Sequence, residues 1–383
     1  MPRKVARSLT QLVFFLIVFL LILYVNRPSS SPPTFAWTKV RYRTTAPSLP
    51  PVRGKCPHLA KSKKPALIVS HVDADGDTSW LTSLQDRYHI CLYDVDGPRA
   101  NEKPSETLQV PANRGHEAMA YLTFLIDNYE NIPAAGAVFV HGSRWAWHND
   151  APDYDNKALL TALNIQRALE AGSGYHNLRC DWSTSTCLAS APAQGSLELQ
   201  LQSITSPWSA RTASDVGLPR ALTAIFGGGV LGIKEGSLTG RTELGRTEKI
   251  RAQCCAQFVV SRERMWQHTR DEYIALRQWL LDGSGGADGG KMRSRNDPAA
   301  PSNDKVAGRI LSYMWHILFA KPDANGMVDL ERLNRDACPN AKECYCRLYG
   351  RCDLRCPGPE TCLGQYKIPK NFKLPDNWEA THG

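Results

Sequence analysis

The sequence predicts an α/β fold in which a mostly parallel sheet is flanked by helices. Apolar runs at 66–70, 88–93 and 137–140 have the length and composition of buried strands. Segments with helical periodicity separate these runs, and such alternation is typical of strands joined by crossover helices. Because parallel strands end at one common edge, we expect any ligand site at that carboxyl edge.

Charge is distributed unevenly along the chain, which has a formal net charge of +9. Residues 1–64 contain 12 Lys or Arg and no Asp or Glu, which leaves 34 basic and 37 acidic residues in the remainder, a balance of −3. The predicted folded part is therefore not basic, and we do not expect nucleic-acid binding.

An apolar run at 12–25, LVFFLIVFLLILYV, follows three basic residues. Counted from Leu9 it has 17 residues, which span roughly 25 Å as a helix. The basic flank predicts a cytosolic N-terminus, so residues 1–26 are interpreted as a cytosolic tail and transmembrane signal anchor. A cleaved signal peptide is the alternative, but Asn26-Arg27-Pro28 offers no small-residue cleavage site. This predicts a single-pass type II membrane protein of the endoplasmic reticulum or Golgi.

Composition divides the remaining chain into three parts. Residues 27–64 are rich in Pro, Ser and basic residues and predict a flexible stem. Residues 65–335 are expected to form a lumenal α/β domain, in which the Gly-rich stretch 282–305 is a mobile insertion. Residues 336–383 form a tail that holds six of the 12 cysteines.

The cysteines agree with an oxidising compartment. Those in the tail are expected to be mostly disulfide-bonded, with a connectivity that the sequence leaves open. A zinc knot is the alternative, but the paired C-x2-C spacing typical of such sites is missing. Cys180 and Cys187 are near enough in sequence to close a small loop.

The strand at 137–140 lies inside the most informative stretch, 113–150. From Glu117 to Tyr129, apolar residues repeat at three and four, which predicts a helix with Asn113 as its N-cap. Further patterns predict a helix opening at 78–81, a strand at 108–110, helices at 158–171, 265–281 and 306–319, and a strand leading into a helix within 254–264. Residues 188–248 show no clear pattern.

Side chains that can take part in chemistry are concentrated after the strand at 137–140. The loop 141–150 holds two His, two Trp, an Arg and an Asp. We interpret it as the active-site loop, with His141, His148 and Asp150 as catalytic residues. The second strand ends in another polar turn, which contains Asp94 and Asp96.

Several motifs of the chain resemble a fungal family of membrane-anchored proteins that carry a domain of unknown function. They are NRGHEAMAYLTFLIDNY, AVFVHG with WHND, GYHNLRC, CCAQFVVSRERM and GRILSYMWHILF. The resemblance runs from about Trp80 to Phe319, and it implies no particular reaction.

The order of parts also resembles a nucleotide-sugar glycosyltransferase of the fold with one Rossmann-like half. That resemblance implies a nucleotide-sugar donor and a glycan or small-molecule acceptor. In such enzymes the loops after the first and second strands, and an Asn/Gly loop that opens the next helix, surround the nucleotide. The residues implied to bind the donor are Asp94, Asp96, Arg114, Glu117, Arg144 and Trp147.

Such enzymes usually end the following strand in Asp-x-Asp, which holds Mn²⁺ against the diphosphate. Here the strand ends in Val140-His141-Gly142, so the chain departs from that pattern. The resemblance then implies Mn²⁺ or another divalent metal held by His141, Asp150 and His316. Without a metal, Arg114 and Arg144 would meet the diphosphate instead.

Other readings of the same residues stay open. A catalytically silent lumenal protein that binds glycans or partners would fit the missing acidic pair, and a metal-dependent hydrolase is a more distant alternative. Glu117 is also favoured by the helix dipole alone, and His316 lies on an otherwise apolar helix that is typical of a core.

Overall fold

The computed structural model describes residues 3–25, 34–36, 39–44, 46, 48–97, 108–150, 154–170, 174–226, 249–284 and 298–364. The chain divides into two compact units, residues 1–33 and residues 34–383. The first unit contains helix α1 (Arg3–Val25), whose described side chains, at 9–22, are all exposed. Within the described ranges, no helix meets the length and apolarity required to cross a bilayer.

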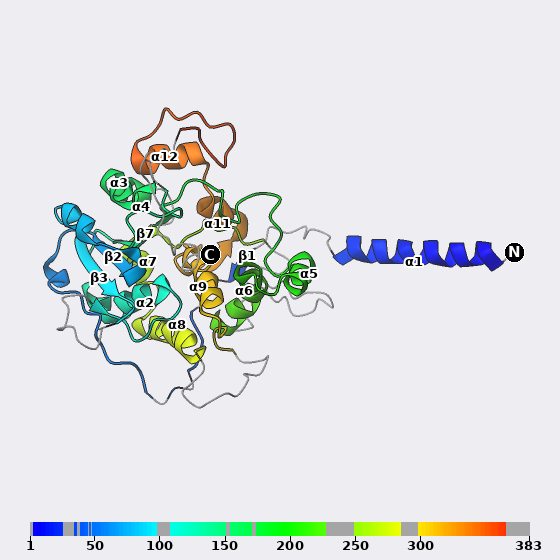
Figure 1. Cartoon of the computed structure of the whole chain (residues 1–383), viewed down its shortest axis with the longest axis horizontal. Helices are drawn as coiled ribbons and strands as arrows, with labels where there is room; N and C mark the ends of the chain where they lie inside the picture. Colours follow the sequence, from blue (N-terminus) through cyan, green and yellow to red (C-terminus); the bar gives the residue numbers. More distant parts are fainter. Residues whose placement is uncertain are drawn as a thin grey trace. The chain divides into compact units, whose positions relative to one another are not determined.

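The second unit is built on a six-stranded sheet with the order β4-β3-β2-β5-β7-β6 (Figure 1). The strands are β2 (Ala66–His71), β3 (His89–Asp94), β4 (Leu108–Gln109), β5 (Ala137–His141), β6 (Tyr175–Asn177) and β7 (Phe258–Val260). Strands β4, β3, β2 and β5 pair in parallel, whereas β7 is antiparallel to β5 and β6. The prediction of an α/β fold with a mostly parallel sheet is confirmed.

Helices and a small second sheet surround this sheet. The helices are α2 (Glu117–Asp127), α3 (Asn156–Ala162), α4 (Ile165–Glu170), α5 (Leu197–Thr205), α6 (Ala210–Phe226), α7 (Arg262–Met265), α8 (Arg270–Asp282), α9 (Asp304–Ser312), α10 (Trp315–Leu318), α11 (Leu330–Ala337) and α12 (Ala341–Tyr349). Short 3₁₀ helices are η1 (Leu59–Lys61), η2 (Asp73–Asp75), η3 (Ser79–Leu84) and η4 (Tyr129–Asn131). The second sheet pairs β1 (Thr34–Ala36) with β8 (Met327–Asp329) in antiparallel fashion.

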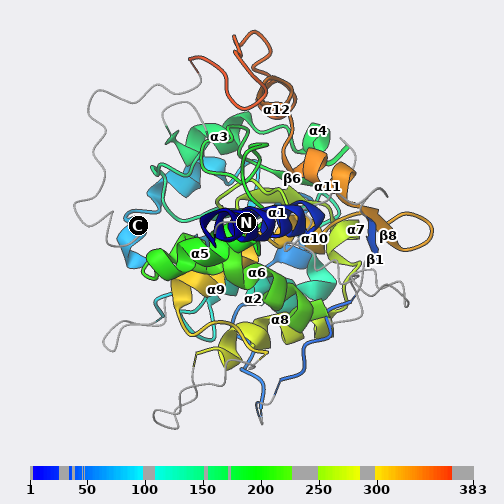
Figure 2. The same ribbon diagram turned by 90° about the vertical axis from the view of Figure 1, so that its right-hand side faces the viewer.

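Both faces of the central strands are buried, as the period of two in a strand requires. In β2, Ala66 and Ile68 belong to one apolar cluster, while Leu67 and Val69 belong to another. The first cluster includes α2, α6, α8 and α9, and the second includes α3, α4 and α12. Accordingly, α12 lies on the same side as α3 and α4 in both views, and α8 lies on the opposite side (Figure 1 and Figure 2).

Helix α2 is buried all round rather than along one face. Its side chains at 118–126 are buried because β2 covers one side while α8 and α9 pack on the others. The predicted N-cap is wrong: the cap is His116, at φ 53°, while Asn113 donates to Asp96 instead. Helix α9 packs close to the start of α2 at Gly308. A Cβ at residue 308 would lie 3.1 Å from the backbone of Gly115.

Some helical segments differ from the prediction. The helix expected at 158–171 is two helices, because Asn164 leaves the helical path and donates its backbone N–H to the carbonyl of Leu348 at 2.7 Å. The stretch 188–248, in which no pattern was found, contains α5 and α6. Residues 227–248, and residues 285–297 of the predicted insertion, lie outside the described part of the chain.

The segment expected to be a flexible stem packs on the domain in its described part. Strand β1 joins the small sheet, Val40 is buried, and Cys56 forms a disulfide with Cys91 of β3. The backbone N–H of Val40 also donates to Glu272 of α8 at 2.8 Å. Composition did not reveal these contacts, because each partner lies far away in sequence.

All 12 cysteines of the chain form disulfides, which confirms the prediction for the tail. The expected Cys180–Cys187 loop is wrong, because Cys180 pairs with Cys344 and Cys187 pairs with Cys338. The remaining pairs are Cys56–Cys91, Cys254–Cys255, Cys346–Cys352 and Cys356–Cys362. Two disulfides therefore fasten the tail to the sheet domain.

Glu272 generates a test of what holds the N-terminal segment in place. Burial opposes its ionisation, but hydrogen bonds from His268, Thr269 and Val40 outweigh that effect and lower the pKa of Glu272 to about 2 from 4.5. A depressed carboxyl pKa contributes stability that is present above pH 4.5 and lost as pH falls toward 2. Glu272→Gln is therefore expected to reduce the free energy of unfolding at pH 7, with a difference from wild type that shrinks below pH 4.5.

Urea unfolding at pH 7, at pH 4.5 and at about pH 2.5 measures this effect, because only the last value lies between the folded and unfolded pKa values of Glu272. Asp271→Asn is the matched control, because Asp271 is exposed in the same first turn of α8. Equal losses for the two variants, or a pH-independent loss for Glu272→Gln, would contradict the assignment.

Candidate functional site

The order of the strands reverses beside β2. From β2 the chain moves outward to β3 and β4, and it then places β5 on the other side of β2. In open α/β sheets, ligands bind outside the carboxyl ends of the strands at such a switch point. The last residues of the two strands are His71 and His141, and Ser70 lies opposite His141 in the register. The loops after β2 and β5 therefore flank the candidate site.

These two loops are in direct contact through Gly142. A Cβ at this position would lie 2.7 Å from Oδ2 of Asp75 and 2.8 Å from Cα of His71. The same Asp75 oxygen accepts the backbone N–H of Val72 at 3.0 Å. Only glycine fits between the loops, and Asp75 is held at the junction.

The turn after β3 joins the same edge. Oδ1 of Asp94 accepts the backbone N–H groups of Asp96 and Gly97 at 3.1 and 3.3 Å. Asp96 in turn accepts the backbone N–H of Asp73 and the side-chain amide of Asn113, each at 2.8 Å. Asp96 thus ties together the loops after β2 and β3 and the loop before α2.

His141 ends β5 in a partly buried position. Its ring Nε2 lies 2.6 Å from the carbonyl oxygen of Cys255, and its ring centre lies 4.3 Å from that of His148. Burial lowers the pKa of His141, against the opposing effects of the Cys255 carbonyl and the charge of Asp75. The imidazole is therefore mainly neutral at neutral pH.

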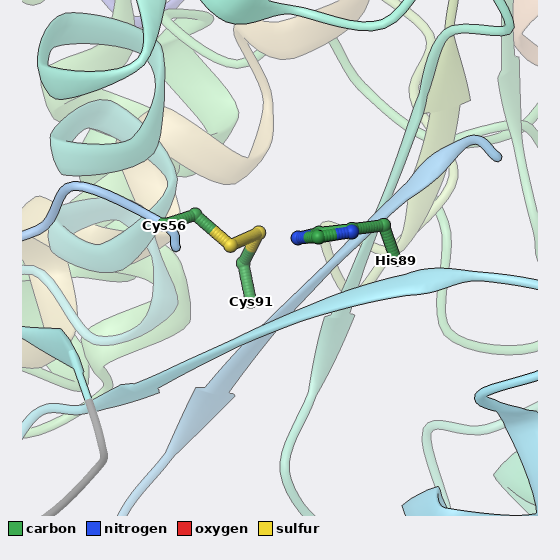
Figure 3. Close-up of side chains that lie close together, drawn as sticks. All are labelled: Cys56, His89 and Cys91. Atoms are coloured by element: carbon green, nitrogen blue, oxygen red, sulfur yellow. A yellow bond between two sulfur atoms is a disulfide. The ribbon is translucent and has the colours of Figure 1, made fainter. Parts of the chain in front are cut away.

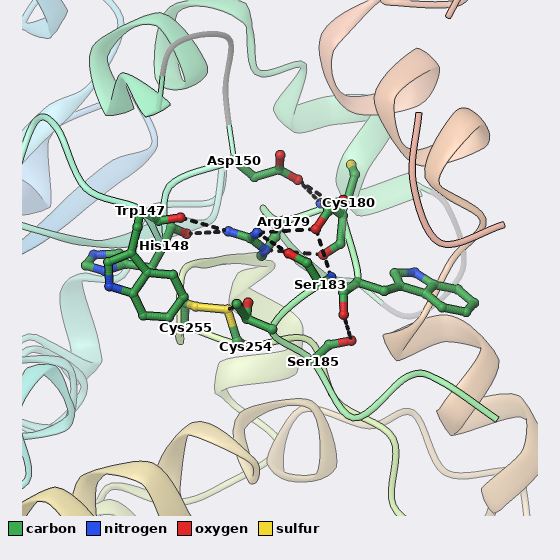
Figure 4. A network of polar contacts seen from close by, with 12 residues as sticks. Trp147, His148, Asp150, Arg179, Cys180, Ser183, Ser185, Cys254 and Cys255 are labelled. Carbon is green, nitrogen blue, oxygen red and sulfur yellow. Dashed lines mark hydrogen bonds and ion pairs between the residues drawn. A yellow bond between two sulfur atoms is a disulfide. The ribbon is translucent and has the colours of Figure 1, made fainter. Parts of the chain in front are cut away.

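The neighbouring loop residues share this environment. His148 is buried, and Trp147 stands edge-on to it with ring centres 5.6 Å apart. The backbone carbonyls of Trp147 and His148 accept hydrogen bonds from Arg179 at 3.4 and 3.2 Å (Figure 4). The structure therefore brings His141, His148 and Trp147 together.

Asp150 is used by the fold. It is 2% exposed, and its Oδ2 accepts the backbone N–H groups of Cys180 and Asp181, the latter at 3.0 Å (Figure 4). Its Oδ1 accepts the hydroxyl of Tyr345, in α12, at 2.7 Å. Next to Tyr345, Cys344 forms the disulfide with Cys180. The carboxylate thus links α12 to the segment that follows β6. Both of its oxygens accept hydrogen bonds from the protein itself.

Arg114 braces helices instead of facing His141. It is 5% exposed and donates to the carbonyls of Leu280 and Ser302 at 3.3 and 3.0 Å. Its Nη1 also lies 3.0 Å from Oδ1 of Asp304, which accepts the backbone N–H of Gly115 at 2.6 Å. The Asp304 carboxylate therefore occupies the anion position at the start of α2 that the sequence reading assigned to a diphosphate.

Arg144 is likewise paired with a carboxylate. Its guanidinium makes two hydrogen bonds of 3.0 Å to Asp155 and lies 4.8 Å from the ring centre of Trp145. The hydrogen bonding with Asp155 raises the pKa of Arg144. Among the hydrogen bonds and ion pairs of the described residues, none joins Arg114 or Arg144 to His141.

The first turns of α2 contribute two further groups. Burial raises the pKa of Glu117 to about 7, partly offset by the charge of His116. Tyr121 is fully buried, and in the described part of the chain its hydroxyl has no hydrogen-bond partner. Burial, followed by the charges of Glu117 and Asp75, raises the pKa of Tyr121. The glycosyltransferase resemblance pointed to the loop after the first strand, HVDADGD, which holds Asp75, but sequence reasoning did not single out Asp75 or Tyr121.

His316 lies away from the carboxyl edge. It is buried, its pKa is lowered to about 4 by that burial, and it lines a pocket of about 190 Å³ together with Tyr175. Tyr175 pairs with Val260, and Val260 pairs with Ala137, which begins β5, whereas His141 ends it. Tyr175 is thus level with the start of β5, which lies roughly 13 Å from the end of β5 at about 3.3 Å per residue. The predicted metal ligands His141, Asp150 and His316 therefore do not converge.

One group of potential metal ligands is preassembled among the described residues. It consists of Cys56, His89 and Cys91, whose ligand atoms lie within 4.8 Å of one another (Figure 3). The two sulfurs form a disulfide, and Nε2 of His89 lies 2.9 Å from the carbonyl oxygen of Pro57. Since metals bind thiolates, the disulfide form is not a ligand set. This group of residues is therefore not a ready site for the predicted divalent metal.

A sequence profile of the family described as "Protein of unknown function (DUF3431)" matches residues 67–347. The match covers well over half of the chain and most of the second unit. The chain belongs to this family. This membership confirms the resemblance to a domain of unknown function that the motifs indicated. A search of curated proteins and a search of solved structures each returned no match.

A larger pocket of this DUF3431 domain opens at the other edge of the sheet. Its volume is about 930 Å³, and its lining includes Pro65 before β2, Ala134 and Ala135 before β5, and Ser261 after β7. We nevertheless place the candidate site at the carboxyl edge. Size alone favours the pocket, but the switch point lies at the carboxyl edge, together with His141 and Glu117, whose pKa values are shifted.

The position of Asp150 gives a direct test of its structural role. Asp150→Asn would turn an amide N–H₂ toward the donors that now surround the carboxylate. We expect a loss of about 2–3 kcal/mol in the free energy of unfolding, measured by urea denaturation. Asp353→Asn is the control, because Asp353 is exposed in the same cysteine-rich region. An unchanged stability for Asp150→Asn would contradict this role.

Proposed function

We propose that the domain binds a nucleotide sugar at the switch point between β2 and β5 and transfers the sugar to a hydroxyl acceptor. The observation that carries the proposal is the junction of three loops at this edge. The glycosyltransferase resemblance implied that the loops after the first and second strands and before the next helix surround the nucleotide. The hydrogen bonds of Asp96 to Asp73 and Asn113 join these loops.

The neighbouring side chains supply suitable acid–base groups. In glycosyl transfer, a base takes the proton of the acceptor hydroxyl while its oxygen attacks the anomeric carbon and the nucleoside diphosphate leaves. We assign the base to His141, which is mainly neutral and lies at the strand end. Glu117, with its pKa of about 7, is able to hold a proton near the leaving diphosphate.

The alternative is a lumenal protein that binds glycans without transferring them. Charge favours it: Asp75, Asp94, Asp96 and Glu117 gather near the edge, while Arg114 and Arg144 are each already paired with another carboxylate. Carboxylates bind sugar hydroxyls well but repel a diphosphate that has no counter-charge. The two proposals therefore differ in whether the domain binds the donor.

We also propose that residues 27–383 lie in the lumen of the secretory pathway, behind an anchor formed by residues 9–25. The disulfides support an oxidising compartment. The apolar run and its basic flank in the sequence support the anchor and its orientation.

A matched pair of histidine variants tests the transfer proposal. His141→Gln is expected to lower sugar-transfer or donor-hydrolysis rates by about 100-fold or more, with little change in melting temperature. His89→Gln should retain activity, because His89 also contacts a carbonyl oxygen but begins β3 at the opposite edge. Uridine and guanosine diphosphate sugars serve as donors for the full-length chain in detergent.

Calorimetry with the same donors separates the alternatives. Donor binding with turnover that depends on His141 supports transfer. Binding of free glycans without donor binding supports the silent protein, and equal activity of the two histidine variants would remove His141 from the mechanism.

Protease protection in sealed microsomes tests the topology. A C-terminal epitope tag should survive protease without detergent and disappear once detergent is added, because the proposed lumenal part includes the tail. Cleavage of the tag in intact microsomes would rule out this orientation.

A further inference from the structure

Cys254 and Cys255 are adjacent in sequence and form a disulfide with each other. The bond closes a small ring that contains the peptide joining the two residues. The backbone of this turn is unusual. Cys255 and Ala256 have φ values of 85° and 46°, in a region that non-glycine residues seldom adopt. Strand β7 begins at Phe258, directly after the turn.

The turn directs a carbonyl group at the candidate base. The carbonyl oxygen of Cys255 lies 2.6 Å from Nε2 of His141. A carbonyl oxygen only accepts hydrogen bonds, so Nε2 must carry the proton. In the neutral imidazole the proton acceptor is then Nδ1.

Polar contacts fasten the disulfide turn to the loop after β5. Oε1 of Gln257 accepts the backbone N–H of His141 at 3.4 Å and the amide of Asn156 at 3.0 Å, while Nε2 of Gln257 donates to Asn149 at 3.0 Å. A further contact holds the disulfide from the segment after β6: the hydroxyl of Thr184 donates to the sulfur of Cys254 at 2.7 Å. Figure 4 shows the disulfide beside Trp147 and His148.

We propose that the Cys254–Cys255 disulfide positions His141 for proton transfer. The disulfide ring holds the Cys255 carbonyl, the carbonyl holds the Nε2–H tautomer, and Nδ1 is thereby left as the acceptor for a hydroxyl proton. That the proton comes from a sugar acceptor rests on the proposed function. The Nε2–H tautomer and its dependence on the disulfide do not rest on the proposed function. Cys254 and Cys255 are positioning residues, since they act through His141.

Ring nitrogen NMR of the full-length chain, labelled with ¹⁵N-histidine and free of ligand, tests the proposal. The signals of His141 are assigned by their absence in His141→Gln. In wild type we expect a protonated Nε2 and an unprotonated Nδ1. In the double variant Cys254→Ser/Cys255→Ser, this single tautomer should be lost, and the two nitrogen shifts should move toward each other.

Cys346→Ser/Cys352→Ser is the matched control, because it also removes a disulfide between cysteines close in sequence, in the tail. It should leave the His141 signals unchanged. A proton on Nδ1 in wild type, free thiols at 254 and 255 in native peptide maps, or an unchanged tautomer in the 254/255 double variant would overturn the proposal.

The wild-type measurement needs His141→Gln for assignment only, and it needs no cysteine variant to fold. Because it also needs no donor or acceptor, its outcome is independent of the transfer assays. A chain that shows the expected tautomer but binds no nucleotide sugar would refute the proposed function and keep the positioning role.

Discussion

Burial of β2 on both faces is the constraint on which the rest of the domain depends. Its residues Ala66–Val69 are fully buried, with strands on either side and helices above and below. Such a strand can present polar groups to a ligand only at its ends. At the carboxyl end, Ser70 and His71 are its first polar side chains, and the strand order reverses at the same place. The location of the candidate site therefore follows from apolar packing.

The sequence was sufficient for features that are encoded locally. Apolar runs predicted β2, β3 and β5 to within one or two residues, and their ends placed Asp94 and His141 at one edge. The roles of Arg114 and Asp150 could not be predicted, because their partners Asp304 and Tyr345 lie 190 and 195 residues away. A polar side chain beside a predicted cleft looks the same in sequence whether it meets a ligand or a distant segment of the chain.

The contact to His141 differs from the carboxylate that orients histidine in many catalytic sites. A carboxylate fixes the tautomer and also stabilises the charged imidazolium. The Cys255 carbonyl fixes the tautomer without a full negative charge, so burial still lowers the pKa of His141. The ring is thus a weaker base than one paired with a carboxylate, but it is present in its basic form at neutral pH.

The two long-range disulfides have a consequence for biosynthesis. Cys180 and Cys187 pair with cysteines 164 and 151 residues later. At about 5–20 residues per second, a ribosome needs on the order of ten seconds or more to make the intervening chain. In the proposed lumenal location, both thiols then meet an oxidising compartment while they are separated by only six residues and lack their native partners. Formation of the native pairs therefore requires that Cys180 and Cys187 stay apart, or that a premature bond between them is exchanged, before the tail arrives.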